Sequence, residues 1–177
     1  ELSEDLIGHV AVSKQICPHL HIPLQSGDDE VLKRMNRPYR SKFFTDLIHH
    51  VSRKIPDAAI GVDVIPGFPG ETQDAFEKTC ALIDELPIAY LHVFPFSPQK
   101  GTRAEGLADP VQSGTIRKRC QHLRQIGQAK RRGFYGSHIG STWEVLIEGK
   151  RDRATGYLKG FTKNYIPVLV KGTDEWF

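Results

Sequence analysis

Residues 19–27, HLHIPLQSG, predict a β-strand that ends in a glycine turn. Leu20, Ile22 and Leu24 alternate with polar or cyclic neighbours, so the strand has two unlike faces. Parallel strands that are covered on both sides normally consist of nearly continuous aliphatic residues. The alternation therefore predicts that one face packs on helices and that the other lines a polar interior or mouth.

Two more strands of the same mixed character are predicted further along, at residues 59–65 and 90–96. Asp63 interrupts the aliphatic run of the first of these, and His92 interrupts the second. A single inward histidine is usually a hydrogen-bonded core residue. Polar residues in one phase of all three strands favour a functional face as strongly as a structural one, because each buried polar group must be satisfied.

Amphipathic helices are predicted between these strands. Ser41 and Thr72 are suitable N-caps, and Pro56 and Pro87 mark the helix ends. The apolar positions recur at helical spacing, with Phe43, Phe44, Leu47, Ile48 and Val51 in the first helix and Phe76, Cys80, Ile83 and Leu86 in the second. Strands that are separated by whole helices require parallel crossovers. The predicted fold class is α/β, with residues 1–112 forming a piece of a parallel sheet or barrel.

A basic helix and a small β-domain are predicted after this α/β part. No Asp or Glu occurs between Pro110 and Trp143, whereas seven cations do: Arg117, Lys118, Arg119, Arg124, Lys130, Arg131 and Arg132. Most such runs are solvated helix faces, but a run without acids also favours a polyanionic partner. We expect a connecting helix at residues 113–136. Short β-like runs then predict an antiparallel β-domain at residues 137–177, which we expect to be incomplete.

Composition restricts the class of protein. The 177 residues are 39% hydrophobic and 25% charged, which is typical of a globular chain. No apolar run approaches the roughly 18 residues of a membrane span, and the acidic start is unlike a signal peptide. Cys17, Cys80 and Cys120 form neither a disulfide framework nor a Cys-x-x-Cys metal motif. We expect a cytoplasmic protein without a membrane partner. Because Met35 is the only methionine, we also expect a fragment.

Each predicted strand is followed by a distinctive turn, at residues 25–27, 67–71 and 97–101. Ligands of α/β barrels bind at these carboxyl-end loops, and glycines allow a ligand to approach the backbone closely. The helix that Thr72 caps has N-terminal amides suited to an anion. Two alternatives stay open: ordinary tight loops, or Asp63 and Glu71 as the acid and base of a barrel hydrolase.

Several ordered motifs together resemble the radical S-adenosylmethionine methylthiotransferases. They are HLHIPLQSG at 19–27, VLKRMNR at 31–37, DVIPGFPGET at 63–72, LHVFPFS at 91–97 and KGT at 100–102. The terminal segment resembles a TRAM domain, the RNA-binding β-module of that family. The resemblance covers nearly the whole chain.

This resemblance implies a partial (β/α) barrel that binds S-adenosylmethionine on a 4Fe-4S cluster and generates a 5′-deoxyadenosyl radical. The family inserts sulfur and a methyl group into a C–H bond. Its cluster-binding Cys-x-x-x-Cys-x-x-Cys motif does not occur in this sequence. We therefore expect no metal ligands here, a missing N-terminal part of the same polypeptide, and no catalysis by this fragment alone.

The family pattern also implies cofactor-binding residues. They are Gln25, Ser26, Gly27, Asp63, Ile65, Gly67, Gly70, Glu71, Phe94 and Pro95. Asp63 stands where the family's short strand-end pattern has its first glycine. Arg37 is the nearest partner for the cofactor carboxylate, since a guanidinium binds a carboxylate bidentately; the alternative is a surface or helix-end arginine.

The sequence of residues 91–97 is most similar to that of the branch that modifies threonylcarbamoyl-adenosine beside the tRNA anticodon. Gln99 and Arg103 depart from that branch, where arginine and proline are common. The alternatives are the isopentenyl-adenosine branch, the ribosomal-protein branch and a noncatalytic RNA-binding module.

With a tRNA anticodon stem-loop as partner, the resemblance implies contacts from cations to phosphates and from aromatic rings to unpaired bases. The residues are Arg117, Lys118, Arg124, Lys130, Arg131, Arg132, Tyr157, Lys159, Phe161 and Lys163. The alternative for the last four is a β-domain core with solvated lysines.

Overall fold

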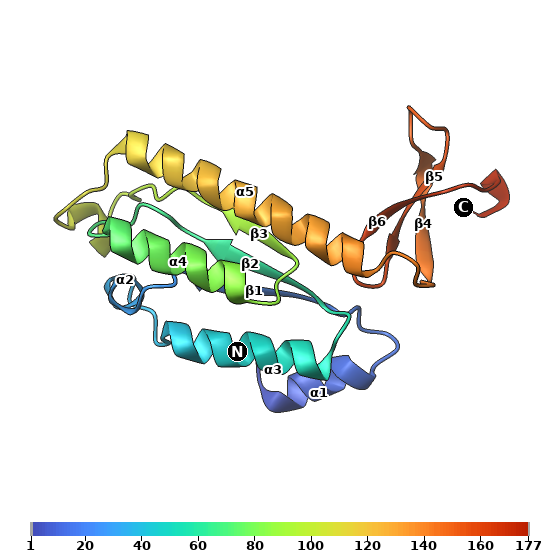
Figure 1. Cartoon of the computed structure of the whole chain (residues 1–177), viewed down its shortest axis with the longest axis horizontal. Helices are drawn as coiled ribbons and strands as arrows, with labels where there is room; N and C mark the ends of the chain where they lie inside the picture. The colour runs from blue at the N-terminus through green and yellow to red at the C-terminus, as the bar shows by residue number, and fades with distance from the viewer. Residues whose placement is uncertain (1, 177) are drawn as a thin grey trace.

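The computed structural model describes residues 2–176, in which two small sheets are joined by a long helix (Figure 1). The first part contains α1 (Glu4–Val12), β1 (His19–Gln25), α2 (Asp29–Arg34), α3 (Ser41–Lys54), β2 (Ala59–Val64), α4 (Gln73–Glu85) and β3 (Tyr90–Val93). The second part contains the 3-10 helix η1 (Arg103–Gly106), α5 (Ser113–Ser137), β4 (Val145–Arg151), β5 (Leu158–Thr162), β6 (Pro167–Val170) and the 3-10 helix η2 (Asp174–Trp176).

The strands of the first sheet are parallel and lie in the order β1-β2-β3. α3 connects β1 to β2, and α4 connects β2 to β3, as parallel crossovers require. Figure 1 shows α3, α4 and α5 side by side along one face of this sheet. The predicted parallel α/β sheet is confirmed, whereas closure into a barrel stays a prediction.

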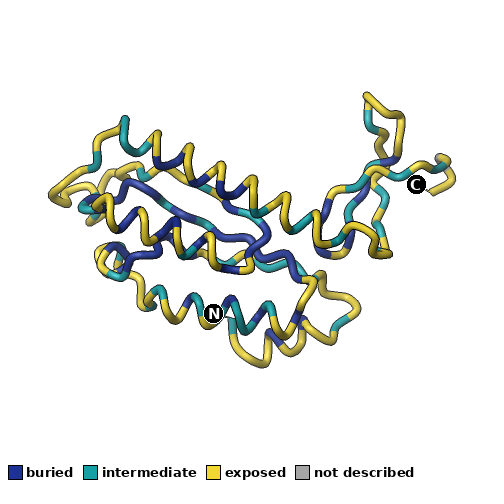
Figure 2. The backbone as a smooth tube through the Cα atoms, viewed as in Figure 1, coloured by how far each residue is buried: buried dark blue, intermediate teal, exposed yellow. Residues whose placement is uncertain are grey.

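The aliphatic residues of the three strands point into one core with the helices. Ile22 pairs with Val62, and Val62 pairs with Leu91 on the other side. Val62 is completely buried, and burial of such a side chain stabilises the fold by roughly 1.5–3 kcal/mol. Buried segments follow β1–β3 and the facing sides of the helices in Figure 2. Because side chains alternate along a strand, Asp63 and His92 lie on the opposite face, as the sequence predicts.

Helix starts are partly as predicted. Thr72 caps α4, because its hydroxyl accepts a hydrogen bond of 3.1 Å from the Ala75 amide. Ser41 is instead the first residue of α3, and Arg40 holds the N-cap position. The reason is that the Ser41 hydroxyl donates to Asp29 at 2.8 Å. The helix is also rotated so that Phe43 is 61% exposed, which corrects its placement in the apolar stripe.

The second sheet is antiparallel, in the order β4-β5-β6, as the turn spacing predicts. It contacts the first part through the turn between β5 and β6. The Asn164 side chain donates to the Asp57 carbonyl at 3.0 Å, and the Tyr165 ring lies 4.6 Å from the His19 ring between centroids. The two sheets are therefore fixed to each other at the amino ends of β1 and β2. The TRAM-like identity of this sheet and the proposed domain boundaries stay predictions.

Removing the α4 cap tests this account of the helix starts. We expect Thr72→Ala to lower the free energy of unfolding by about 1 kcal/mol, because an orphan amide loses its acceptor. Gln112→Ala is the matched control, since Gln112 is the N-cap of α5 but makes no side-chain cap bond. Urea unfolding of both variants measures the difference, and equal losses would contradict the capping role.

Candidate functional site

The carboxyl ends of the three parallel strands form one continuous edge. The Ile65 amide donates to the Gln25 carbonyl at 2.9 Å, and the Phe94 amide donates to the Val64 carbonyl at 3.0 Å. These bonds bring the predicted residues Gln25, Ile65 and Phe94 together. We call these three residues the strand-end rim.

Gln25 is the most unusual residue of the rim. Its φ of 71° lies in the left-handed region, which is costly for a residue with a side chain. The residue is only 7% exposed, yet its side-chain oxygen has no hydrogen-bond partner within the described residues. A strained backbone and an unsatisfied buried acceptor indicate that this position is shaped for a ligand. The rim thus fits the bound cofactor that the family pattern implies.

The turn after Gln25 is held by α4. The Gly27 amide donates to the Thr79 hydroxyl at 2.9 Å, and the Ser26 hydroxyl lies 3.4 Å from the same oxygen. A Cβ at Gly27 would lie 2.7 Å from the Thr79 Cα, so only glycine fits here. Ser26 and Gly27 therefore position the rim through contacts within the protein. The sequence does not single out Thr79, because it occupies an ordinary helical position.

The turn at residues 67–71 is closed by a buried ion pair. Arg119 on α5 donates to the Glu71 carboxylate at 2.6 Å, and the Gly67 amide donates to the same oxygen at 2.7 Å. The side chains are 6% and 1% exposed. Burial raises the pKa of the Glu71 carboxyl, while the Gly67 amide and Arg119 act in the opposite direction. Glu71 is thus engaged with α5, whereas Asp63 has other partners.

Arg119 is a structural residue that the sequence reasoning placed in the basic run. One signal could have found it: Arg119, Leu123 and Ile126 follow helical spacing, and the last two are core residues. The carbonyl of Glu71 also accepts a bond of 3.1 Å from Arg119. Arg119 therefore anchors α5 to the strand-end turn.

The remaining predicted cofactor residues lie around this turn or away from it. Gly67 has a φ of 90° and packs against Ile116, and Gly70 has a φ of 80° beside the Arg34 guanidinium. Pro95 is exposed. Arg37 is also exposed, in the loop after α2. Its charge acts on the nearby Tyr39 hydroxyl, whose pKa it lowers against the larger opposite effect of burial, and its role toward a carboxylate stays a prediction.

A polar face lies on the side of the sheet opposite to the helices, and we define it as His19, His21, Asp63, Tyr90 and His92. Asp63 lies 2.7 Å from His21 and 3.4 Å from His92. Tyr90 and His19 continue this group toward the amino ends of the strands, with 2.8 Å between the Tyr90 hydroxyl and the His19 ring. Burial and the neighbouring His21 lower the pKa of His19.

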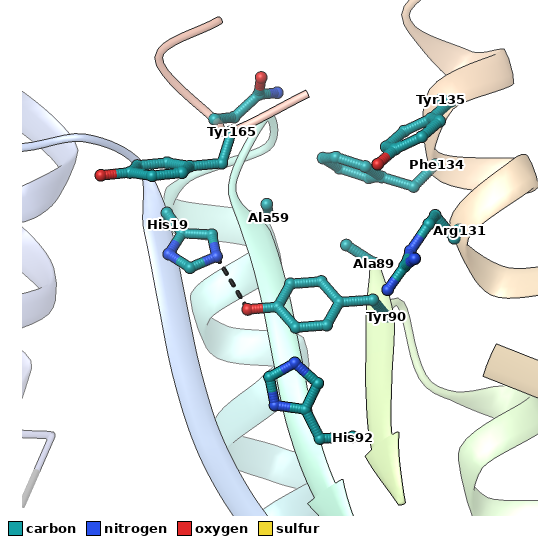
Figure 3. A pocket seen from close by; sticks show the side chains of 10 residues that line it. His19, Ala59, Ala89, Tyr90, His92, Arg131, Phe134, Tyr135 and Tyr165 are labelled. Carbon is teal, nitrogen blue, oxygen red and sulfur yellow. Dashed lines mark hydrogen bonds between the residues drawn. The ribbon is translucent and has the colours of Figure 1, made fainter. Parts of the chain in front are cut away.

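A pocket closes the amino end of the polar face (Figure 3). Tyr165 covers His19, and the Arg131 guanidinium lies 5.9 Å from the centre of the Tyr90 ring. Phe134, near the end of α5, completes the aromatic wall. The sequence did not predict this pocket, because its residues come from β1, β2, β3, α5 and the β5–β6 turn. Its aromatic rings and single guanidinium are suited to a planar base.

The cations of α5 divide into two sets because the helix turns once in about 3.6 residues. Arg119 and Lys130 face the protein, and Lys130 donates to the carbonyls of Asp84 and Leu86 at 2.6 and 2.9 Å. Five cations are exposed, and we call them the outer arginine–lysine face: Arg117, Lys118, Arg124, Arg131 and Arg132. The basic run is therefore both structural and available to a polyanion.

The predicted RNA-binding residues of the second sheet are mostly engaged with acids or rings. Lys159 lies 3.7 Å from Asp152, and Lys163 pairs with Glu144. Phe161 is half-buried, with its ring centroid 6.1 Å from that of Tyr165. Tyr157 is exposed at 41%.

None of the helices within residues 2–176 combines the length and the apolar character that a membrane crossing requires.

Comparison with known proteins gives the class first. Residues 7–83, which include β1, β2 and most of α4, match the radical SAM superfamily. The match thus covers β1 and β2, the first two strands of the sheet at whose end the rim lies.

The chain is also similar to individual proteins that are named as tRNA-modifying enzymes. The chain is 33% identical over 97% of its length to the tRNA-2-methylthio-N(6)-dimethylallyladenosine synthase of Pelotomaculum thermopropionicum. It is 34% identical over 99% of its length to the threonylcarbamoyladenosine tRNA methylthiotransferase MtaB of Bacillus subtilis, and 39% identical over 95% to the protein of that name from Rickettsia prowazekii. It spans 38%, 39% and 38% of these relatives. The resemblance to radical SAM methylthiotransferases is confirmed over nearly the whole chain.

The buried ion pair gives a direct stability test. We expect Arg119→Met to lower the free energy of unfolding by about 3 kcal/mol, because it leaves the Glu71 carboxylate buried without its partner. Lys118→Met removes the neighbouring exposed cation and should change stability by less than about 0.5 kcal/mol. Urea unfolding compares the two, and a loss in Lys118→Met as large as that in Arg119→Met would refute the anchoring role.

Proposed function

We propose that this chain is part of a radical S-adenosylmethionine tRNA methylthiotransferase. In this proposal the intact protein adds a methylthio group to a modified adenosine next to the anticodon. The observation that carries it is the combination of a ligand-shaped strand-end rim with a helix whose outer face is basic, in a chain similar to such enzymes over nearly its whole length. The rim serves the cofactor, and the helix serves the RNA.

S-adenosylmethionine together with a four-iron four-sulfur cluster supplies the radical chemistry in this proposal. Gln25, Ile65 and Phe94 would border the cofactor, and the buried Gln25 oxygen would be available to accept a hydrogen bond from it. Ser26 and Gly27 hold the rim in place through Thr79, and Gly67 and Glu71 do so through α5, whereas the Gly70 amide donates to the Asp109 carbonyl at 2.8 Å. The protein thus fixes the position of the cofactor by packing on the helix side of the sheet.

The cysteines favour a cluster that is held by another part of the polypeptide. A cluster needs thiolate ligands. Burial raises the pKa of the Cys80 thiol to about 11, and it also raises the pKa of Cys120. These two thiols are poor ligands, and Cys17 is the one exposed cysteine of the described residues. We therefore propose that this chain supplies part of the cofactor site but is not catalytic alone.

The RNA partner is proposed to lie along the outer arginine–lysine face. Guanidinium and ammonium groups bind phosphates without regard to sequence, and each contact releases counterions. The aromatic pocket at the end of α5 offers rings on which an unpaired base can stack. Phosphate attraction along the helix and base stacking at its end together suit a stem-loop.

Threonylcarbamoyl-adenosine is the proposed nucleoside, because the sequence of residues 91–97 is most similar to the branch that modifies it. Dimethylallyl-adenosine is the second candidate, because relatives of comparable identity carry that name. The two nucleosides differ in charge, since the threonyl group carries a carboxylate and the dimethylallyl group is apolar. Their anticodon stem-loops therefore make a discriminating pair of ligands.

RNA binding by the outer face is tested by two triple variants of equal charge change. We expect Arg117→Glu/Arg124→Glu/Arg132→Glu to weaken binding of an anticodon stem-loop by more than tenfold and to reduce the salt slope by about 2 to 3, because three phosphate contacts are lost. Lys33→Glu/Lys42→Glu/Arg53→Glu changes exposed cations of α2 and α3 and serves as the control. Fluorescence anisotropy over a salt series measures both.

Equal weakening by the two triple variants would show that only net charge matters and would contradict the proposed face. If the protein without substitutions binds no stem-loop at low salt, this part of the protein does not recognise RNA. With threonylcarbamoyl-, dimethylallyl- and unmodified loops in parallel, tighter binding of the first supports the proposed nucleoside, and tighter binding of the second supports the alternative.

A further inference from the structure

We infer that His21, Asp63 and His92 form a binding site for one divalent transition-metal ion on the polar face. The three side chains come from β1, β2 and β3, and their ligand atoms all lie within 4.8 Å of one another. The site shares His92 with the wall of the aromatic pocket, and none of its three residues belongs to the strand-end rim. It goes beyond the proposed function, which assigns these residues no metal.

The strand register places the three side chains together. Asp63 pairs with His92 on β3 and with Pro23 on β1, and His21 precedes Pro23 by two positions on the same face. The Asp63 carboxylate oxygen lies 2.7 Å from His21 Nε2 and 3.4 Å from His92 Nδ1. Metal–ligand bonds of about 2.0–2.2 Å place neighbouring ligand atoms roughly 2.9–3.5 Å apart. Small side-chain shifts therefore admit an ion.

The ligand set selects the class of metal. Two imidazoles and one carboxylate suit Zn²⁺, Co²⁺, Ni²⁺ or Fe²⁺, whereas Mg²⁺ and Ca²⁺ prefer oxygen ligands alone. Three protein ligands also leave positions for water or another small molecule. The proposed site thus has coordination positions that the protein leaves unfilled.

A supporting hydrogen bond orients the first ligand. His21 Nδ1 lies 3.4 Å from the Tyr90 hydroxyl, which in turn lies 2.8 Å from His19. When its Nδ1 is occupied in this way, His21 presents Nε2 to Asp63 and to the proposed ion. Gly61 makes this arrangement possible, because a Cβ at that position would overlap the Tyr90 ring.

The site is open to ions from solution. The side chains of His21, Asp63 and His92 are 32%, 24% and 49% exposed. The Asp63 oxygen that faces both rings is itself buried and takes part in no hydrogen bond of good geometry within the described residues. A buried carboxylate oxygen between two imidazoles is a suitable ligand for a cation. The competing explanation is a polar network without metal, which predicts no binding.

Zn²⁺ titration by calorimetry tests the site directly. We use the Cys17→Ser protein throughout, because Cys17 is an exposed thiol and thiolates are zinc ligands in general. We expect one Zn²⁺ per chain in this background. Asp63→Asn and His92→Gln should each weaken binding at least tenfold. His9→Gln removes an exposed histidine of α1 and should leave the affinity unchanged.

A second variant tests the orienting role of Tyr90. We expect Tyr90→Phe to weaken Zn²⁺ binding by about tenfold, because it removes the hydroxyl next to His21. Thermal unfolding gives an independent readout, since Zn²⁺ should raise the Tm of the Cys17→Ser protein but not that of His92→Gln. His92 is half exposed, so its replacement is compatible with folding.

Absence of Zn²⁺ binding in the Cys17→Ser protein would overturn the proposal. Unchanged affinity in both Asp63→Asn and His92→Gln would also overturn it, because the ion would then lie elsewhere. Stem-loop binding by Asp63→Asn without metal keeps the two proposals apart, because Asp63 does not line the aromatic pocket. Loss of metal binding with intact RNA binding in this variant concerns the metal site alone.

Discussion

The Arg119–Glu71 ion pair is the contact on which the rest of the arrangement depends. It joins the helix that carries the basic face to the turn that follows β2. Two buried charges cost several kcal/mol each to desolvate, and only close geometry with further hydrogen bonds offsets this cost. Here the Gly67 amide and the Glu71 carbonyl supply those bonds. The pair thereby fixes both the strand-end turn and the course of α5.

The first sheet has two faces with different physical roles. Its aliphatic face packs on α1, α3, α4 and α5 and supplies the core. Its polar face carries imidazoles, a carboxylate and a phenol, which are solvated or paired with one another. Stability therefore comes from one side, and the other side is free to hold ligands. The strand-end rim lies where the two faces meet the loops, so packing on the core side can position a cofactor.

Local sequence patterns predicted both sheets and the face on which the polar strand residues lie. The helices between the strands predicted the parallel sheet, alternation along β1–β3 predicted the phase of its polar residues, and turn spacing predicted the antiparallel sheet. Contacts between distant segments were not predictable. Ser41 binds Asp29 and so loses the cap position, and Arg119 turns inward from a run that is otherwise outward. The pocket of His19 and Tyr165 needs both sheets, and no local period encodes that contact.

The course of α5 sets a distance. Ile116, near its start, packs at Gly67 beside the strand-end turn, whereas Phe134, near its end, lines the aromatic pocket. Eighteen residues separate them, which corresponds to about 27 Å of helix. A single molecule that occupied the pocket and also reached the strand ends would have to cross that length along a charged surface. The length of α5 thus fixes the spacing between the pocket and the strand ends. Removing one turn of the helix would change that spacing, so that such a ligand could no longer reach both regions at once.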